Sequence, residues 1–267
     1  MNKQSHIMYI AHGGGPLPLL GDPNHQEMID TLNCMATQVG KPSAILVISA
    51  HWEASVPTIT ASVKPELIYD YGGFPAEAYE IRYPSFGQPD LANKIYRALT
   101  NAGIEAALDE HRGFDHGMFV PLKIMFPEAD IPVVQLSLVH TLDAQAHLEI
   151  GKALQALDVD NLLVIGSGFS YHNMRTFFNA DGEMANRKNI AFDNWLKETV
   201  TDTELSEDDR YKRLAQWDEA PDGRFCHPRE EHLLPLHVCY GMAGKASDGY
   251  FTAVVMNKKA SMFSWQV

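Results

Sequence analysis

The chain has 267 residues, with 34 Asp and Glu against 21 Lys and Arg, so its formal net charge is −13. Binding to nucleic acid or to an anionic membrane surface needs a clustered excess of Lys and Arg, so we expect neither partner. No apolar run approaches the roughly 18 residues of a membrane span, and the apolar stretch near the start is too short for a signal peptide. The three cysteines form no C-x-x-C pair, a usage typical of a reducing compartment, which predicts a cytoplasmic protein.

Short apolar runs alternate with amphipathic stretches along the chain, without a linker or a repeat. The runs are typical of strands buried on both faces of a sheet, and the amphipathic stretches repeat apolar residues at helical spacing. We expect strands at 7–12, 44–52, 57–62, 104–108, 131–139, 161–166 and 252–256. We expect helices at 25–38, 89–102, 143–157 and 185–200, a short apolar helix ending at Phe126, and a helix that Pro228 begins. This alternation predicts one α/β domain over residues 1–267.

Two histidines each end an apolar run. His12 precedes three glycines, and His51 closes the run that begins at Ala44. Ligands of parallel sheets bind beyond the carboxyl ends of the strands, so the two side chains predict a metal site there. The glycines beside His12 also allow a ligand to approach the backbone closely. The structural alternatives are a strand-end histidine bonded to the backbone at position 12 and a buried histidine packed against Trp52 at position 51.

Three further histidines are weaker candidates when each is taken alone. His172 follows a predicted strand and a glycine turn, so it has the same topological position as His12. His116 lies in a loop between an aspartate, which could orient it, and a glycine. His232 lies beside two glutamates at a predicted helix start, where solvent-facing polar residues are common. The others are expected to be surface or structural residues: His6, His25, His111, His140, His147, His227 and His237.

The signatures of several other chemistries are absent from the sequence. It has no H-E-x-x-H, no G-x-x-x-x-G-K-[ST] and no G-x-G-x-x-G after a strand, which argues against a zincin, a P-loop enzyme and a dinucleotide-binding fold. The segment Gly168–His172 approaches a nucleophile elbow, but a histidine stands where that sharp turn needs glycine. A histidine-rich site favours a metal such as Zn or Fe over Mg or Ca, which prefer oxygen ligands.

Seven segments of the chain, in order, resemble the class III extradiol ring-cleavage dioxygenases, specifically their DOPA 4,5-dioxygenase branch. The resemblance spans roughly residues 6–240 and depends on all seven segments together. The segments are Ala11–Pro16, Ser49–Trp52, Tyr71–Pro75, Gly113–Gly117, Pro127–Ser137, His172–Arg175 and Glu231–Leu236. The resemblance implies a three-layer α/β/α fold with a largely parallel or mixed central sheet.

The resemblance also implies one divalent metal ion, with Fe(II) expected for ring cleavage and Zn(II) as the alternative. His12, His51 and His232 match ligand positions of the family. His172 matches a position that serves either as a fourth ligand or as the acid/base histidine, and His116 matches a further active-site histidine.

The chain departs from the family at two points. Three glycines follow His12 where the family often has His-Gly-Ser-Pro, which affects the loop and the fit of the substrate. Better-studied relatives complete the metal site with a carboxylate, whereas the matching position here is His232. If a carboxylate ligand exists, Glu231 or Glu230 is the candidate.

The implied activity is the opening of a small aromatic diol of the catechol type with dioxygen. His172 or His116 could take a proton from the second hydroxyl and later return one, because an imidazole exchanges protons near neutral pH, and we favour His172 as the base. Tyr71, Phe74 and Phe114 could line the ring. Two other functions stay open, a zinc hydrolase that uses the same histidines and a non-catalytic metal-binding relative. The sequence is also compatible with a homo-oligomer.

Overall fold

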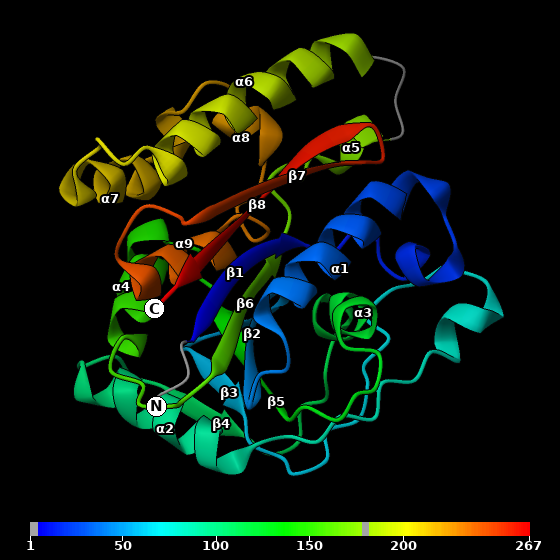
Figure 1. Ribbon diagram of the computed structural model, residues 1–267, viewed down its shortest axis with the longest axis vertical. Coiled ribbons are helices and arrows are strands. Elements are labelled where there is room, and N and C mark those ends of the chain that lie inside the picture. Colours follow the sequence, from blue (N-terminus) through cyan, green and yellow to red (C-terminus); the bar gives the residue numbers. More distant parts are fainter. Residues whose placement is uncertain (1–4, 178–181) are drawn as a thin grey trace.

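The computed structural model describes residues 5–177 and 182–267, and these contain one mixed sheet of eight strands (Figure 1). The strands are β1 (His6–Ala11), β2 (Ala44–Ala54), β3 (Thr58–Thr60), β4 (Ala107–Asp109), β5 (Val133–Val139), β6 (Leu162–Gly168), β7 (Gly249–Val255) and β8 (Lys258–Gln266). Their order is β4-β3-β5-β2-β6-β1-β8-β7. The central strands β5, β2, β6 and β1 are parallel, whereas β8 pairs antiparallel to β1 and β3 antiparallel to β5. The predicted α/β class with a mixed sheet is confirmed.

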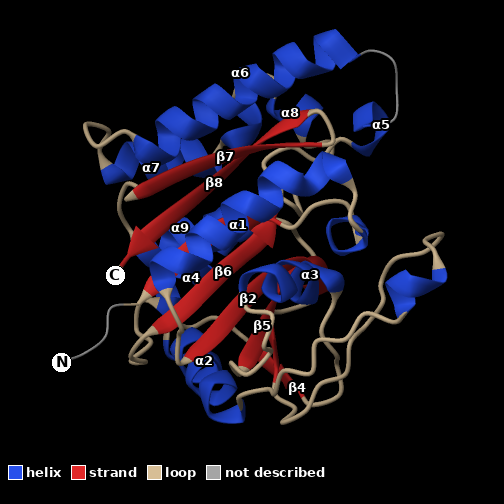
Figure 2. Cartoon of the chain, turned by 45° about the vertical axis from the view of Figure 1, so that its right-hand side comes forward, coloured by secondary structure: helices blue, strands red, loops and turns tan. Residues whose placement is uncertain are grey.

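Helices cover both faces of this sheet (Figure 2). One layer contains α1 (Gln26–Val39) and α3 (His116–Met125). The opposite layer contains α2 (Pro89–Asn101), α4 (Ala144–Leu154) and α9 (Leu234–Ala243), and it is extended by α6 (Gly182–Thr201) over β8 and by α7 (Glu207–Ala215) against α4. Two one-turn helices, α5 (Met174–Phe177) and α8 (Gly223–Cys226), connect these elements. The result is the three-layer α/β/α arrangement that the resemblance implies.

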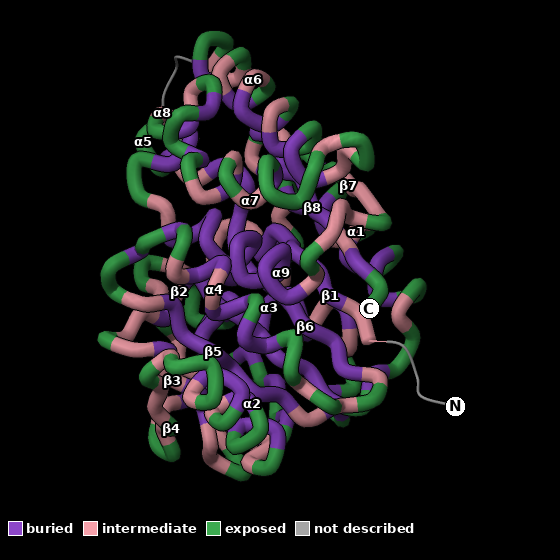
Figure 3. The backbone as a smooth tube through the Cα atoms, turned by 90° about the vertical axis from the view of Figure 1, so that its left-hand side faces the viewer, coloured by how far each residue is buried: buried purple, intermediate pink, exposed green. Residues whose placement is uncertain are grey.

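The central strands are buried on both faces, which explains their continuous apolar runs. Residues Ile7–Ala11 of β1 are each at most 1% exposed, and residues Ala44–Ile48 of β2 are each at most 3% exposed (Figure 3). A strand with a helix layer on each face has no solvent-facing side, so its sequence does not alternate. One cluster of buried apolar residues extends from Ile7 to Trp265.

The prediction that Pro228 begins a helix is wrong. The helix α9 begins at Leu234, with Pro235 in its first turn, and residues 227–233 form turns before it. His232 therefore lies in a turn and not on a helix. The chain turns there because the carbonyl of His232 bonds to groups at the ends of β1 and β6, described below.

The sequence prediction of a single last strand is incomplete. Residues 249–266 form a hairpin of β7 and β8, and β8 was not predicted. The two turn residues, Met256 and Asn257, both have positive φ, at 49° and 63°, as a tight type I′ hairpin turn requires. Lysines and serines interrupt the apolar residues of β8, so its strand pattern is weak.

The position of His51 also differs from the prediction of a strand end. Strand β2 continues to Ala54, and its register with β5 shifts between Ile48 and Glu53. His51 lies within this irregular stretch, where the ladder is broken. By contrast, His12 directly follows the last residue of β1, as predicted.

Acid should destabilise the protein partly through His147. Its Nδ1–H donates to the Asp143 carbonyl at 2.7 Å and its Nε2 accepts the Val139 N–H at 3.1 Å, so the neutral ring satisfies both contacts. Burial is the main cause that lowers the pKa of His147. Below the ordinary histidine pKa of about 6.5, His147 binds a proton in the unfolded chain but stays neutral in the folded chain. The free energy of unfolding therefore falls with decreasing pH, by up to about 1.4 kcal/mol per pH unit for this one group.

Urea unfolding of the metal-free protein at about pH 7.5 and about pH 5.5 measures this effect. The variant His147→Gln should lose less stability between the two pH values than the wild type does. His140 is the matched control, because its side chain is 62% exposed. In His140→Gln the free energy of unfolding should change with pH as it does in the wild type. If His147→Gln and the wild type lose the same free energy of unfolding between the two pH values, His147 does not contribute to the acid destabilisation.

Among the described residues, no helix is both long and apolar enough to cross a membrane. The three cysteines, Cys34, Cys226 and Cys239, are free thiols. The cytoplasmic location inferred from the sequence stays a prediction.

Candidate metal centre

The side chain of His12 is fixed by the end of β6. Its Nδ1 lies 3.0 Å from Ser167 Oγ, and that hydroxyl donates its only proton to the Gly117 carbonyl. Ser167 must therefore accept from Nδ1–H, which leaves the lone pair of His12 on Nε2. Burial is the main cause that holds the pKa of His12 well below its usual range, so the ring is neutral.

His51 and His116 share one carboxylate, that of Asp70. The backbone N–H and the Nδ1–H of His116 donate to Asp70 Oδ1 at 3.0 and 2.8 Å, and Nδ1 of His51 lies 3.8 Å from Asp70 Oδ2. Burial favours a higher pKa for Asp70, but the hydrogen bonds from His116 outweigh it and lower the pKa, so the carboxylate is ionised. Burial lowers the pKa of His51 to about 3. Both rings thus direct Nδ1 toward the protein.

His172 and His232 share a second carboxylate, that of Glu231. A single oxygen, Oε1, lies 2.9 Å from Nδ1 of His172 and 3.0 Å from Nδ1 of His232. The two rings stack, with centroids 3.4 Å apart. Burial is the main cause that lowers the pKa of His232 well below its usual range. This pair repeats the arrangement of His51 and His116 around Asp70.

The turn that carries His232 is attached to the sheet through its own backbone. The His232 carbonyl accepts a hydrogen bond from Tyr9 Oη at 2.9 Å and from the Phe169 N–H at 3.0 Å. A Cβ on Gly168 would lie 2.1 Å from the same carbonyl oxygen, so only glycine permits this approach. Strands β1 and β6 thus hold a residue that is far from both in the sequence.

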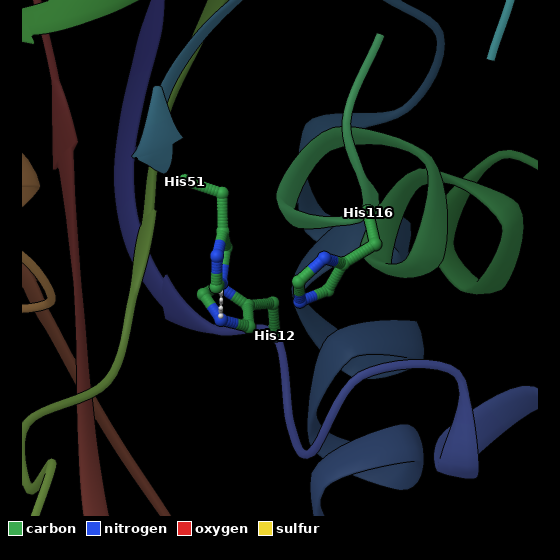
Figure 4. A group of neighbouring side chains, drawn as sticks. All are labelled: His12, His51 and His116. Carbon is green, nitrogen blue, oxygen red and sulfur yellow. Dashed lines mark hydrogen bonds between the residues drawn. The ribbon is translucent and has the colours of Figure 1, made fainter. Parts of the chain in front are cut away.

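The three histidines with ligand matches surround one point. Their ring centroids are 4.8 Å apart for His12 and His51, 5.1 Å for His12 and His232, and 4.9 Å for His51 and His232. His116 also faces this point, with its centroid 3.9 Å from that of His51, and Figure 4 shows its ring turned toward His12 and His51. The possible ligand atoms of His12, His51 and His116 lie within 4.8 Å of one another, as do those of His172, Glu231 and His232.

Two ring nitrogens meet at the centre of this group. Nε2 of His12 and Nε2 of His51 are 3.0 Å apart, the hydrogen bond marked by the dashed line in Figure 4. Because His12 has its lone pair on Nε2, Nε2–H of His51 donates to it, and a cation bound here would take the place of that proton. Neutral imidazole nitrogens suit Zn, Fe and similar ions, so the residues fit the metal that the sequence predicts.

A cavity of about 350 Å³ opens at these nitrogens. All five candidate histidines line it, together with Tyr71 and Phe74, as the sequence predicts. Phe114 does not line the cavity, because its side chain is fully buried in the core.

The acidic and hydroxyl residues around the histidines differ in part from the sequence prediction. Asp70 and Ser167 were not predicted, although Asp70 lies in the glycine- and aromatic-rich stretch before Pro75. Of the two proposed carboxylate ligands, Glu230 instead pairs with Arg224, at 2.8 Å. Glu231 is at the site, where it bonds the Nδ1 atoms of two histidines.

Asp70→Asn should weaken metal binding by about 10- to 100-fold, the usual effect of removing a carboxylate behind a metal-ligating histidine. Asparagine keeps the size of the side chain and removes the charge that orients His116 and faces His51. Competition with a chromophoric chelator measures the metal Kd, and circular dichroism checks the fold. Asp130→Asn is the matched control, because Asp130 pairs with Lys41 on the surface. Equal metal affinity in Asp70→Asn and the wild type would show that Asp70 does not orient the ligands.

Comparisons with known proteins identify the family of the chain. A protein family described as the catalytic LigB subunit of aromatic ring-opening dioxygenase matches residues 7–264. The chain is 38% identical to "Dioxygenase tasH" of Hapsidospora irregularis, with 89% of this chain and 78% of that protein covered. It is 41% identical to "4,5-DOPA dioxygenase extradiol" of Beta vulgaris, over 78% of this chain and 75% of the relative. A crystal structure of an uncharacterized protein from Escherichia coli K12 has the same fold, with a TM-score of 0.76, 28% identity and coverage of 98% and 99% of the two chains.

These matches confirm the resemblance found in the sequence and support an extradiol ring-cleaving dioxygenase with a metal cofactor. Because the family match covers nearly all of the chain, the protein belongs to the LigB family of aromatic ring-opening dioxygenases.

Proposed function

We propose that this enzyme opens the ring of a catechol-type substrate with dioxygen at an Fe(II) ion held by His12, His51 and His232. The observation that carries the proposal is the convergence of neutral Nε2 atoms on one side of the cavity, with Nδ1 of His12 on Ser167 and Nδ1 of His232 on Glu231. His12 and His232 are thus each oriented by a hydrogen-bond partner behind the ring, and Nδ1 of His51 faces Asp70 at 3.8 Å. A second copy of the chain as a partner stays a prediction.

Three protein ligands would leave open positions at the ion for a diol and dioxygen. Such a site suits both catalytic zinc and non-haem iron. We propose Fe(II) because ring opening with dioxygen needs a redox-active metal.

The reaction balances without a further reductant. One ring C–C bond beside the diol breaks, and both atoms of dioxygen enter the product, one in a new carboxyl group and the other in an aldehyde. A bound ferrous ion supplies the charge that favours diol ionisation and the electron route between diol and dioxygen.

The protein moves the protons in this proposal. His172 lines the cavity, and its Nδ1–H on Glu231 leaves the lone pair of Nε2 free to accept the proton of the second hydroxyl and to return one later. His116 has the same kind of partner in Asp70, and it lies closer to His51 than to His12, with centroid distances of 3.9 and 5.6 Å. We assign the acid/base role to His172 and a place beside the diol to His116.

Anaerobic reconstitution with Fe(II) or Zn(II), followed by catechols and dioxygen, tests the proposal. We expect oxygen consumption equal to the substrate opened and a yellow semialdehyde, with Fe(II) and not with Zn(II). Ester or amide hydrolysis by the Zn(II) form, without oxygen uptake by the Fe(II) form, would support a zinc hydrolase instead. Tight metal binding without turnover of any catechol would point to a non-catalytic relative.

A further inference from the structure

The metal-binding cavity has a second half that the chemistry above does not use. Apart from the histidines, Tyr71 and the glycines 13–15, the residues that line it are apolar: Leu17, Phe74, Phe169, Met174, Phe177 and Met256. The cavity lies within the range of roughly 300–1,000 Å³ in which proteins bind small molecules. A diol bound at the histidines therefore directs its ring substituent toward side chains without charge.

No cationic side chain among residues 5–177 and 182–267 lines this cavity. Tyr71 carries the one hydroxyl among the described residues that line it, and this hydroxyl donates its proton to the Ala78 carbonyl at 2.6 Å, so the proton is not available to a carboxylate. The charged side chains directly behind the histidines are the carboxylates of Asp70 and Glu231. A carboxylate on the substituent would leave water without a cationic side chain to pair with among these lining residues, which is unfavourable.

Cations elsewhere near this end of the sheet have other partners or face solvent. Arg229 bonds Glu53 through both terminal nitrogens, at 2.6 and 2.7 Å, and its Nη1 lies 3.5 Å from Oε2 of Glu231. Nζ of Lys258 donates to Asn186 at 2.8 Å. Arg175 follows Met174 in α5, but its side chain is exposed and does not line the cavity.

We propose that the preferred substrates are catechols with an uncharged, apolar ring substituent, such as an alkyl or aryl group, and not catechols with a carboxylate or amino-acid side chain. This inference rests on the proposed function and names the substrate class of the same site. It separates this chain from the relatives whose names refer to DOPA, since DOPA carries both a carboxylate and an ammonium group.

The test uses the Fe(II)-loaded enzyme and catechols of one skeleton. The uncharged members are 4-propylcatechol and the methyl ester of 3-(3,4-dihydroxyphenyl)propanoate, and the charged ones are the free propanoate and DOPA. We expect kcat/KM to be at least about tenfold higher for the uncharged members. Equal or higher kcat/KM for the free propanoate or DOPA would overturn the inference and leave ring opening intact. If no catechol is opened, the proposed function itself fails.

A cation added at the cavity wall provides a second test. The Met174 side chain is 53% exposed, so Met174→Lys is compatible with folding. It should raise kcat/KM for the propanoate relative to its methyl ester by at least about tenfold, because it gives the carboxylate a partner. The matched control is Met184→Lys on α6, 47% exposed and outside the cavity wall, which should keep the wild-type ratio. If Met174→Lys leaves the ratio of kcat/KM for the propanoate and its methyl ester unchanged, the ring substituent does not lie beside Met174.

Arg175 is the alternative partner for a substrate carboxylate, and the variant Arg175→Gln tests this alternative. In our interpretation Arg175→Gln keeps the wild-type ratio of propanoate to methyl ester. A wild-type preference for the propanoate that disappears in Arg175→Gln would overturn the inference and identify Arg175 as the anchor of a charged substrate.

Discussion

Replacing His12 by Ala should leave the enzyme without bound Fe(II) and lower ring opening by more than roughly 100-fold, beyond the effect of removing a supporting carboxylate. Nε2 of His12 faces Nε2 of His51 at 3.0 Å, so the variant removes half of the pair that meets at the centre of the site. Metal content by mass spectrometry and oxygen uptake measure the two effects. His51→Ala should have the same result.

The control for these variants is His111→Ala, because His111 is exposed and does not line the cavity. His232→Ala and His116→Ala then decide which histidine is the third ligand. We expect the first to lose the metal and the second to keep it. The reverse result would replace His232 by His116 in the ligand set, a choice that the clustering of ligand atoms alone leaves open.

Replacing His172 by Ala should keep most of the metal and lower kcat by about 10²- to 10⁴-fold, the usual contribution of a general acid–base residue. His172 has its Nδ1 on Glu231 and lines the cavity, where it can reach a bound diol. The loss should appear in kcat more than in KM, because proton transfer occurs in the transition state.

Because His172 stacks on His232, the Ala variant could also move a ligand. His172→Gln keeps more of the stacked surface and separates the two effects. Full metal content and low kcat in both variants would support the assignment of His172 as the base. Loss of metal in both would make His172 a fourth ligand.

The sequence predicts the sheet centre and the histidines well because both have local signals. The runs at Ile7–Ala11 and Ala44–Ile48 are long, apolar and bounded by turn residues, so their strands were expected. His12 directly follows such a strand, and His172 lies four residues after the end of β6. The side chain of His51 was expected at the site, although its strand continues past it to Ala54.

Contacts between distant parts of the chain were not predictable in the same way. Asp70 bonds His116 across 46 residues of sequence, and Ser167 bonds His12 across 155. Neither partner has a local pattern that marks it, since aspartate and serine are common in loops and at strand ends. The turn at His232 was mistaken for a helix start because its geometry depends on Tyr9 and Phe169.

The attachment of the His232 carbonyl to Tyr9 and Phe169 has a consequence for the assembly of the holoenzyme. Because these hydrogen bonds tie the ligand turn to the sheet, we expect the chain to fold first and to acquire the metal ion afterwards. This differs from zinc fingers, in which the ion drives folding. Metal then acts as an ordinary ligand of the native state and raises the melting temperature with its free concentration. We therefore expect the metal ion to exchange in the folded protein without unfolding of the ligand turn.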